Sequence, residues 1–115
     1  MIYKIVPAAL WREAVAVGMF AGSPVDRADG FMHFSTAVQA AETAARHFAG
    51  QPDLLLVAVD EGAIRDNLRW EPSRGGALFP HLYGPLPLTA VCWTAPLPVA
   101  ADGRHMFPVL GTSST

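Results

Sequence analysis

The feature that most constrains the fold is an uninterrupted apolar run of six residues, Leu54–Val59. A strand covered on one face alternates apolar with polar residues, whereas a strand covered on both faces is apolar throughout. The run therefore predicts a central strand in a sheet with further layers on both sides. The chain has 115 residues, of which 51% are hydrophobic and 16% charged, which is sufficient for one core in one domain.

Two helices are predicted, both in the first half of the chain. Residues 8–17 lie between Pro7, which suits the first turn of a helix, and Gly18, which suits its end. Residues 36–49 lie between a capping hydroxyl and Gly50. On a helical wheel, the apolar face of the second helix comprises Val38, Ala41, Ala44, Ala45 and Phe48.

Short strands account for most of the remaining chain. Residues 21–30 are expected to form a loop, and residues 60–66 a helical turn. Two helices and about five to six strands predict a single α+β domain with a mixed, split sheet. That domain spans residues 1–98, and residues 99–115 are a tail that wraps or frays. The predicted strands are 1–6, 31–35, 54–59, 68–71, 78–83 and 88–94.

Composition and charge narrow the possible functions. A net charge of −2 without a basic stripe argues against binding to nucleic acid. No apolar stretch approaches the ~20 residues that span a bilayer, and no signal peptide precedes Met1, so a cytoplasmic, non-membrane protein is expected. Cys92 lies in an apolar run and is expected to be a buried, inert thiol. Phe34 and Trp70 are expected in the core.

The first candidate site lies in residues 30–36, which read Gly-Phe-Met-His-Phe-Ser-Thr. Side chains alternate along a strand, so His33 and Ser35 share one face while Met32 and Phe34 take the other, toward the core. The following helix begins with free N–H groups that can bind an anion. An imidazole, a hydroxyl and a helix terminus together indicate a phosphate or carboxylate site. The alternative is that Ser35 only caps the helix and His33 bonds a loop carbonyl.

The second candidate site lies in residues 69–85. Alternation places His81 and Tyr83 on one face of a strand, and the preceding segment carries Glu71 and Arg74. These four side chains are a dense polar group for a chain so poor in charge. The alternative is an ion pair between Arg74 and Glu71 that ties down a long loop, with both rings half buried.

Lys4 and a metal site are weighed separately. Lysine commonly blunts an edge strand, and this interpretation of Lys4 is favoured over a role at the site. His33, Glu71 and His81 can hold a metal ion only if the fold brings them together. The chain contains no HxH, HExxH or CxxC spacing, so no metal site is assigned.

Three motifs together resemble the bacterial domain-of-unknown-function family 952. They are Ile2–Ile5, Asp29–Thr36 and Glu71–Leu86, and the similarity covers nearly the whole chain, to about residue 98. The fold of that family is thought to be similar to the ADP-ribosyltransferase and RNA 2′-phosphotransferase group, in which a split α+β sheet holds NAD or a related nucleotide in a cleft. The resemblance implies catalytic roles for His33, His81 and Glu71, and ligand-binding roles for Lys4, Ser35, Thr36, Arg74 and Tyr83.

One departure leaves the activity open. Glycosyl transfer from NAD passes through an oxocarbenium-like state that a carboxylate near the ribose usually stabilises, and the strand at 88–94 contains no carboxylate. Either Glu71 takes that role or the cleft binds without catalysing. The hypotheses are an enzyme acting on a nucleotide-like or phosphorylated small molecule, a non-catalytic sensor of such a ligand, and a protein-interaction module. A monomer or weak homodimer is expected.

Overall fold

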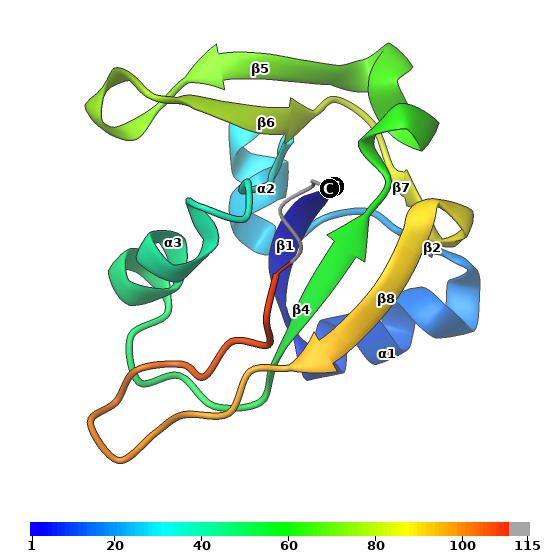
Figure 1. Ribbon diagram of the computed structural model, residues 1–115. Helices are drawn as coiled ribbons and strands as arrows, with labels where there is room; N and C mark the ends of the chain where they lie inside the picture. Colours follow the sequence, from blue (N-terminus) through cyan, green and yellow to red (C-terminus); the bar gives the residue numbers. More distant parts are fainter. Residues whose placement is uncertain (111–115) are drawn as a thin grey trace.

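The computed structural model describes residues 1–110, apart from the side chain of Arg74. A three-stranded antiparallel sheet lies at its centre, with β4 (Leu54–Val59) between β1 (Ile2–Pro7) and β8 (Val91–Pro96) (Figure 1). All residues of β4 are buried except for one that is partly exposed. The prediction of a central strand covered on both faces is confirmed.

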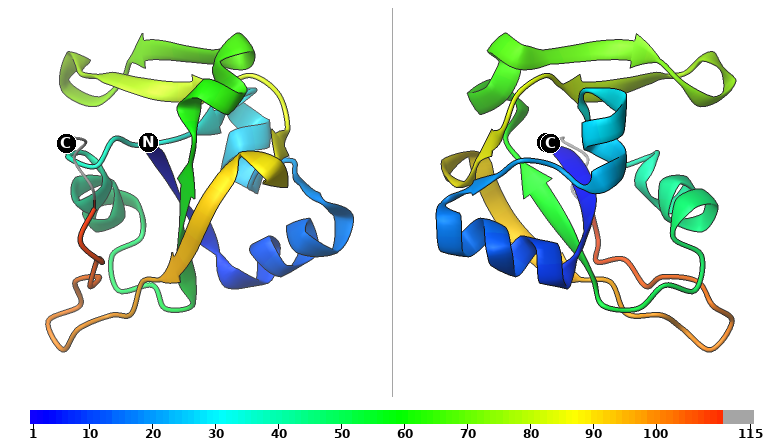
Figure 2. Two further views of the ribbon diagram at one scale, coloured as in Figure 1. Left: turned by 45° about the vertical axis from the view of Figure 1, so that its right-hand side comes forward. Right: turned by 180° about the vertical axis from the view of Figure 1, so that it is seen from behind.

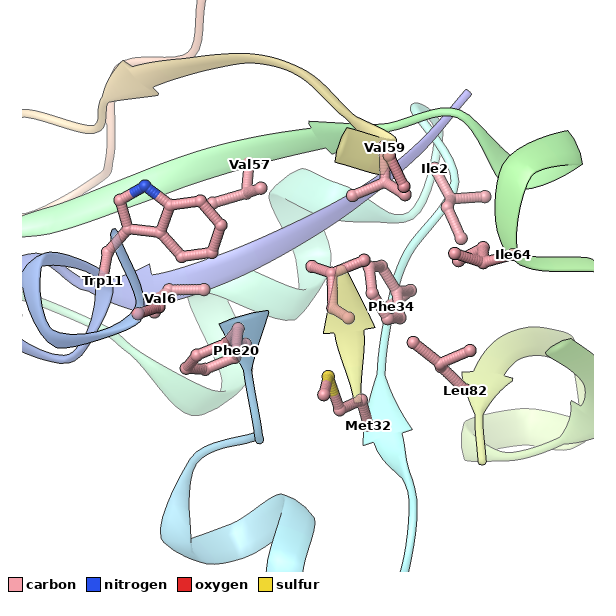
Figure 3. Packing of buried hydrophobic residues seen from close by; sticks show 13 residues of the cluster. Ile2, Val6, Trp11, Phe20, Met32, Phe34, Val57, Val59, Ile64 and Leu82 are labelled. Atoms are coloured by element: carbon pink, nitrogen blue, oxygen red, sulfur yellow. The ribbon is translucent and has the colours of Figure 1, made fainter. Parts of the chain in front are cut away.

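The uninterrupted apolar run is explained by two hydrophobic clusters, one on each face of this sheet. Because successive side chains point to opposite faces, Val57 and Val59 enter one cluster, while Leu56 and Ala58 enter the other. Figure 3 shows part of the first cluster, whose members include Ile2, Val6, Trp11, Phe34, Val57 and Leu82. The second includes Tyr3, Ile5, Ala44, Leu56 and Leu97.

Two helices cover the two faces of the sheet (Figure 2). The first, α1 (Ala8–Val17), buries Trp11 and Ala14 in the first cluster. It follows Pro7 and ends at Gly18, whose φ of 91° is the left-handed conformation that glycine adopts most easily. The boundaries expected for this helix are confirmed.

The second helix, α3 (Ala40–His47), is shorter than expected and buries a face that matches the expected one only in part. Residues 37–39 form a turn, in which the hydroxyl of Thr36 accepts a hydrogen bond from the backbone of residue 39. Val38 in this turn is 88% exposed, and the buried residues of the helix are Ala40 and Ala44. Of the expected face, Ala44 is buried and Phe48 packs against the second cluster, whereas Val38, Ala41 and Ala45 are exposed. Residue 38 precedes the helix, so including it on the wheel shifted the expected face away from Ala40.

A helix that the sequence pattern did not predict, α2 (Pro24–Asp29), occupies the expected loop. The Ser23 hydroxyl accepts a hydrogen bond from the backbone N–H of Asp26, and the Asp26 carboxylate accepts one from the backbone N–H of Ser23. This reciprocal capping box starts the helix, and Gly30 ends it. A content of Gly, Pro and Asp typical of loops masked the capping signal.

The remaining strands form two further antiparallel sheets, so the described residues contain three separate antiparallel sheets where a mixed, split sheet was expected. In one, β6 (Leu78–Leu82) lies between β3 (Met32–His33) and β5 (Leu68–Pro72). In the other, β2 (Met19–Phe20) pairs with β7 (Leu86–Pro87). The domain is therefore α+β, with antiparallel strands and three α-helices.

Three short 3₁₀ segments complete the chain up to β8. The first, η1 (Glu61–Asn67), begins at Asp60, whose side chain accepts a hydrogen bond from the backbone N–H of residue 62. It confirms the helical turn expected there. The second, η2 (Arg74–Gly76), lies between β5 and β6, and the third, η3 (Leu88–Ala90), delays the start of the last strand by three residues relative to prediction.

Several expectations about burial are tested as well. Phe34 is buried, as expected, but Trp70 on β5 is 41% exposed and Cys92 is exposed, so both were placed wrongly in the core. Within residues 1–110 both lie on edge strands, and the strand face that carries each of them is largely exposed. Of the expected tail, Phe107 and Leu110 pack against the second cluster, and residues 111–115 lie outside the described part of the chain.

Within residues 1–110, none of the helices has the length and apolar character needed to cross a membrane.

Candidate functional site

The antiparallel pairing of β3 with β6 places His33 directly opposite His81. Their ring centroids are 5.6 Å apart and the rings meet nearly edge to face, at 69°. Met32 and Phe34, which flank His33 in sequence, are both buried in the first hydrophobic cluster, so the core anchors this segment and turns the imidazole the other way. The two histidines of the two sequence candidates thus share one face.

His33 is held by a buried ion pair. Its Nδ1 lies 2.7 Å from Oδ1 of Asp26, and Oδ2 of Asp26 lies 2.9 Å from the ammonium of Lys4. The ammonium also donates a hydrogen bond of 2.9 Å to the backbone carbonyl of His33. Lys4 is only 5% exposed, so the interpretation as an edge-blunting lysine is wrong: α2 and β3 cover its side chain.

This arrangement sets the charge of both partners. Burial alone would raise the pKa of the Asp26 carboxyl, but the hydrogen bond from His33 and the nearby charge of Lys4 outweigh burial and hold the pKa well below its usual range. Burial lowers the pKa of Lys4, and the Asp26 carboxylate opposes that shift. Asp26 is therefore a permanent anion at ordinary pH, and it accepts hydrogen bonds but cannot donate them.

The second ring nitrogen of His33 faces another carboxylate. Nε2 lies 3.0 Å from Oδ2 of Asp29, the last residue of α2. Asp29 is largely exposed, and so is a substantial part of the His33 ring. One side of the imidazole is therefore fixed inside the protein, while the other meets an exposed carboxylate.

His81 has a carboxylate partner of its own. Its Nδ1 lies 2.8 Å from Oε1 of Glu71, and the same oxygen accepts a hydrogen bond of 2.7 Å from the hydroxyl of Tyr83. The hydrogen bonds from Tyr83 and His81 lower the pKa of Glu71, and the bond to Glu71 raises the pKa of Tyr83. Glu71 is thus an ionised carboxylate with two hydrogen-bond donors, His81 and Tyr83; an ion pair with Arg74 stays a prediction, because the side chain of Arg74 lies outside the described part of the structure.

Aromatic rings surround the two histidines. Phe31 stacks on His81 at 4.2 Å and 27°, and its ring centroid lies 4.8 Å from that of His33 and 5.3 Å from that of Tyr83. The guanidinium of Arg69 lies 5.2 Å from the centroid of the Tyr83 ring, a cation–π contact. The site thus combines two imidazoles with flat apolar surfaces.

The other predicted site residues lie elsewhere or outside the described residues. The hydroxyl of Ser35 shares a hydrogen bond of 2.9 Å with that of Thr43 on α3, so Ser35 neither caps the helix nor contacts the histidine rings. Thr36 lines a different hollow, of about 780 Å³, beside Tyr3 and Trp93. The backbone of Arg74 lies in η2, and its side chain lies outside the described part of the structure.

Sequence reasoning missed Asp26, Asp29, Phe31 and Arg69 as members of this site. The motif Ser-Pro-Val-Asp at residues 23–26 signals a capped helix, and this signal could have placed Asp26 and Asp29 on a helix just before the histidine strand. No pattern in the sequence shows that Asp26 meets Lys4. Among the described residues, no group of three His, Cys, Asp or Glu side chains is arranged to hold a metal ion.

The fold and the site define a class: a small α+β domain with a cross-strand pair of histidines, each supported by a carboxylate. The chain belongs to the family described as "Protein of unknown function (DUF952)", whose model matches residues 5–94. The resemblance found in the sequence motifs is thereby confirmed at the level of the family. No curated protein matches the chain.

Solved structures of one protein are similar over most of the chain. The crystal structure of protein CC0527 from Caulobacter crescentus is 51% identical, with a TM-score of 0.88, and the match covers 91% of this chain and 92% of that one. The solution NMR structure of CC0527 is 52% identical, with a TM-score of 0.81 and coverage of 90% and 89%. The two structures show that CC0527 has the same fold as this chain, and their descriptions name no activity.

Proposed function

We propose that the face carrying His33 and His81 is the active site of an enzyme that performs general acid–base chemistry on a nucleotide-like or phosphorylated small molecule. The observation that carries this proposal is the pair of carboxylate–histidine contacts, Asp26 with His33 and Glu71 with His81, whose rings lie 5.6 Å apart. A carboxylate on Nδ1 orients an imidazole and stabilises its protonated form, so that Nε2 can take or give a proton.

Two such histidines supply complementary halves of one reaction. One histidine removes a proton from the attacking group while the other delivers a proton to the leaving group. Each proton transfer is faster when the reacting groups are held in position. Substitution at phosphorus or at a glycosidic carbon can use such an acid–base pair. The rings are 5.6 Å apart, close enough to reach neighbouring atoms of one substrate once Phe31 moves off the buried ring of His81.

The surroundings favour a ligand with a flat ring and an anionic group. Phe31 and Tyr83 offer aromatic surfaces for stacking, and Arg69 supplies a cation beside Tyr83. Arg74 remains the predicted clamp for a phosphate, and Ser35 and Thr36 are the less favoured of the predicted ligand contacts, because their hydroxyls bond within the protein.

The finer hypothesis is an ADP-ribosyltransferase-like enzyme that uses NAD or a related nucleotide. It is supported by the motifs shared with a family whose fold is thought similar to that group. In this hypothesis the Glu71 carboxylate stabilises positive charge on the ribose, which suits its lowered pKa and its two hydrogen-bond donors.

A ligand screen followed by a turnover assay tests the proposal. NAD, ADP-ribose and phosphorylated metabolites are each added while thermal unfolding is recorded; a ligand at 100 times its dissociation constant adds ~2.7 kcal/mol to the free energy of unfolding. Every ligand that stabilises the protein is then incubated with it and analysed by mass spectrometry for a product. We expect turnover that is lost in His33→Gln and in His81→Gln but retained in His47→Gln, a change at an exposed histidine of α3.

A non-catalytic ligand sensor is the second candidate, and one observation favours it. In the structure Asp29 lies against Nε2 of His33, and Phe31 covers His81, so both rings are occupied by the protein's own side chains. A ligand that stabilises the wild type, fails to stabilise His33→Gln and is never consumed would establish the sensor. Absence of stabilisation by every nucleotide would reject the proposed ligand class.

A further inference from the structure

The acid–base chemistry of the histidines does not by itself require a lysine in the core, yet Lys4 is buried on β1. Burying a charge is costly unless it is paired and hydrogen-bonded. The Lys4 ammonium meets both conditions through the Asp26 carboxylate and the carbonyl of His33, each at 2.9 Å. Both of its contacts lead to the same histidine, one through its backbone and one through the partner of its ring.

Asp26 is surrounded by donors on both oxygens. Oδ1 accepts from the backbone N–H of His33 at 3.2 Å and lies 2.7 Å from the ring Nδ1, while Oδ2 accepts from the backbone N–H of Ser23 at 2.9 Å and faces Lys4. An ionised carboxylate only accepts hydrogen bonds, so each carboxylate that faces the ring favours a proton on its own nitrogen: Asp26 on Nδ1 at 2.7 Å and Asp29 on Nε2 at 3.0 Å. Asp29 is exposed and can exchange this contact for water, whereas Asp26 is buried, so a neutral ring keeps its proton on Nδ1.

We infer that Lys4 and Asp26 are positioning residues that hold the proton of His33 on Nδ1 and leave Nε2, on the exposed side of the ring, as the reacting nitrogen. Lys4 keeps Asp26 ionised and in place, and it fixes the backbone of His33 at the same time. This inference rests on the proposed function for its biological meaning, but the tautomer of His33 is a property of the folded protein itself.

His81 provides a comparison within the molecule. Its Nδ1 also faces a carboxylate, but Glu71 is partly exposed and is held by Tyr83, with no contact to Lys4. A change at Lys4 should therefore alter His33 and leave His81 as it was. A general loss of structure, by contrast, alters both rings.

The test is nitrogen NMR of the histidine rings over a pH titration, in the ligand-free protein. In the wild type, the neutral form of His33 should carry its proton on Nδ1 and none on Nε2. In Lys4→Met, we expect the signals of His33 to move toward a mixture of tautomers while those of His81 stay unchanged; Arg12→Met, which removes an exposed charge on α1, should change neither. A wild-type His33 with its proton on Nε2, or a Lys4→Met protein whose two rings are both unchanged, would overturn the inference.

The outcome does not depend on finding a substrate. If Lys4→Met fails to fold, the tautomer of His33 in the wild type still decides whether the inference holds. Asp26→Asn then supplies a second variant with a similar shape. If a substrate is found, Lys4→Met should lower turnover on the order of 10- to 100-fold, as expected when the partner of a functional histidine is disturbed. A confirmed tautomer without turnover would refute the proposed enzyme and leave the positioning role intact.

Discussion

Replacing Asp26 with alanine should lower the free energy of unfolding by about 3–5 kcal/mol. The change leaves the buried ammonium of Lys4 without the carboxylate that lies 2.9 Å away, and a charge that is buried alone costs far more than a lost surface contact. A domain is stabilised by roughly 5–15 kcal/mol in total. For a chain of this size the melting temperature should therefore fall by roughly 12–20 °C.

Two further variants separate the buried charge from the capping of α2. Ser23→Ala removes the capping hydroxyl but keeps the ion pair, and should cost about 1 kcal/mol. The double variant Lys4→Met, Asp26→Ala contains neither charge, so it should be more stable than Asp26→Ala alone. Circular dichroism during thermal and urea unfolding measures all three. A double variant that is no more stable than Asp26→Ala would refute the argument from buried charge.

Three other predictions follow from burial and charge. Because the folded state lowers the pKa of Asp26, its contribution to stability is present above about pH 4 and is lost as the pH falls toward the lower folded value; urea unfolding should show a shallower acid decline in Asp26→Asn. Phe34→Ala should cost about 3–5 kcal/mol, whereas Trp70→Ala on the exposed strand should cost about 1 kcal/mol or less, and a reversed order would contradict the burial in the structure. Cys92 is exposed, so a thiol reagent should modify the native protein without urea; complete protection would contradict its position.

The parts of the fold that could be predicted are those set by local pattern. The uninterrupted apolar run required a central strand, and the pair of Pro7 and Gly18 fixed both ends of α1. The predictions that were wrong concerned burial, which depends on which neighbouring elements cover a strand or helix. The alternating pattern around Trp70 cannot show that β5 is an edge strand with both faces largely exposed, and the apolar surroundings of Cys92 cannot show that residues 1–110 leave one face of β8 uncovered.

The same distinction holds at the site. Alternation along each strand is enough to predict which way the rings of His33 and His81 point relative to their neighbours, because a strand fixes the direction of each side chain. Their direct opposition, however, depends on the register between β3 and β6. The contact of Lys4 with Asp26 spans less of the sequence but could not be predicted either, since it joins the first strand to a helix that the sequence pattern did not predict.

The register of β3 and β6 is fixed by the core and not by the site. β3 contains only two residues, and its first residue, Met32, is paired with Leu82, both of which pack in the first hydrophobic cluster. A slip of one residue would expose Met32 and bury the His33 ring, and it would also break the contacts of that ring with Asp26 and Asp29. Core packing and the carboxylate contacts therefore favour the same register. The same interactions that stabilise the fold consequently hold the two rings opposite each other, with the His33 ring partly exposed and His81 only 5% exposed.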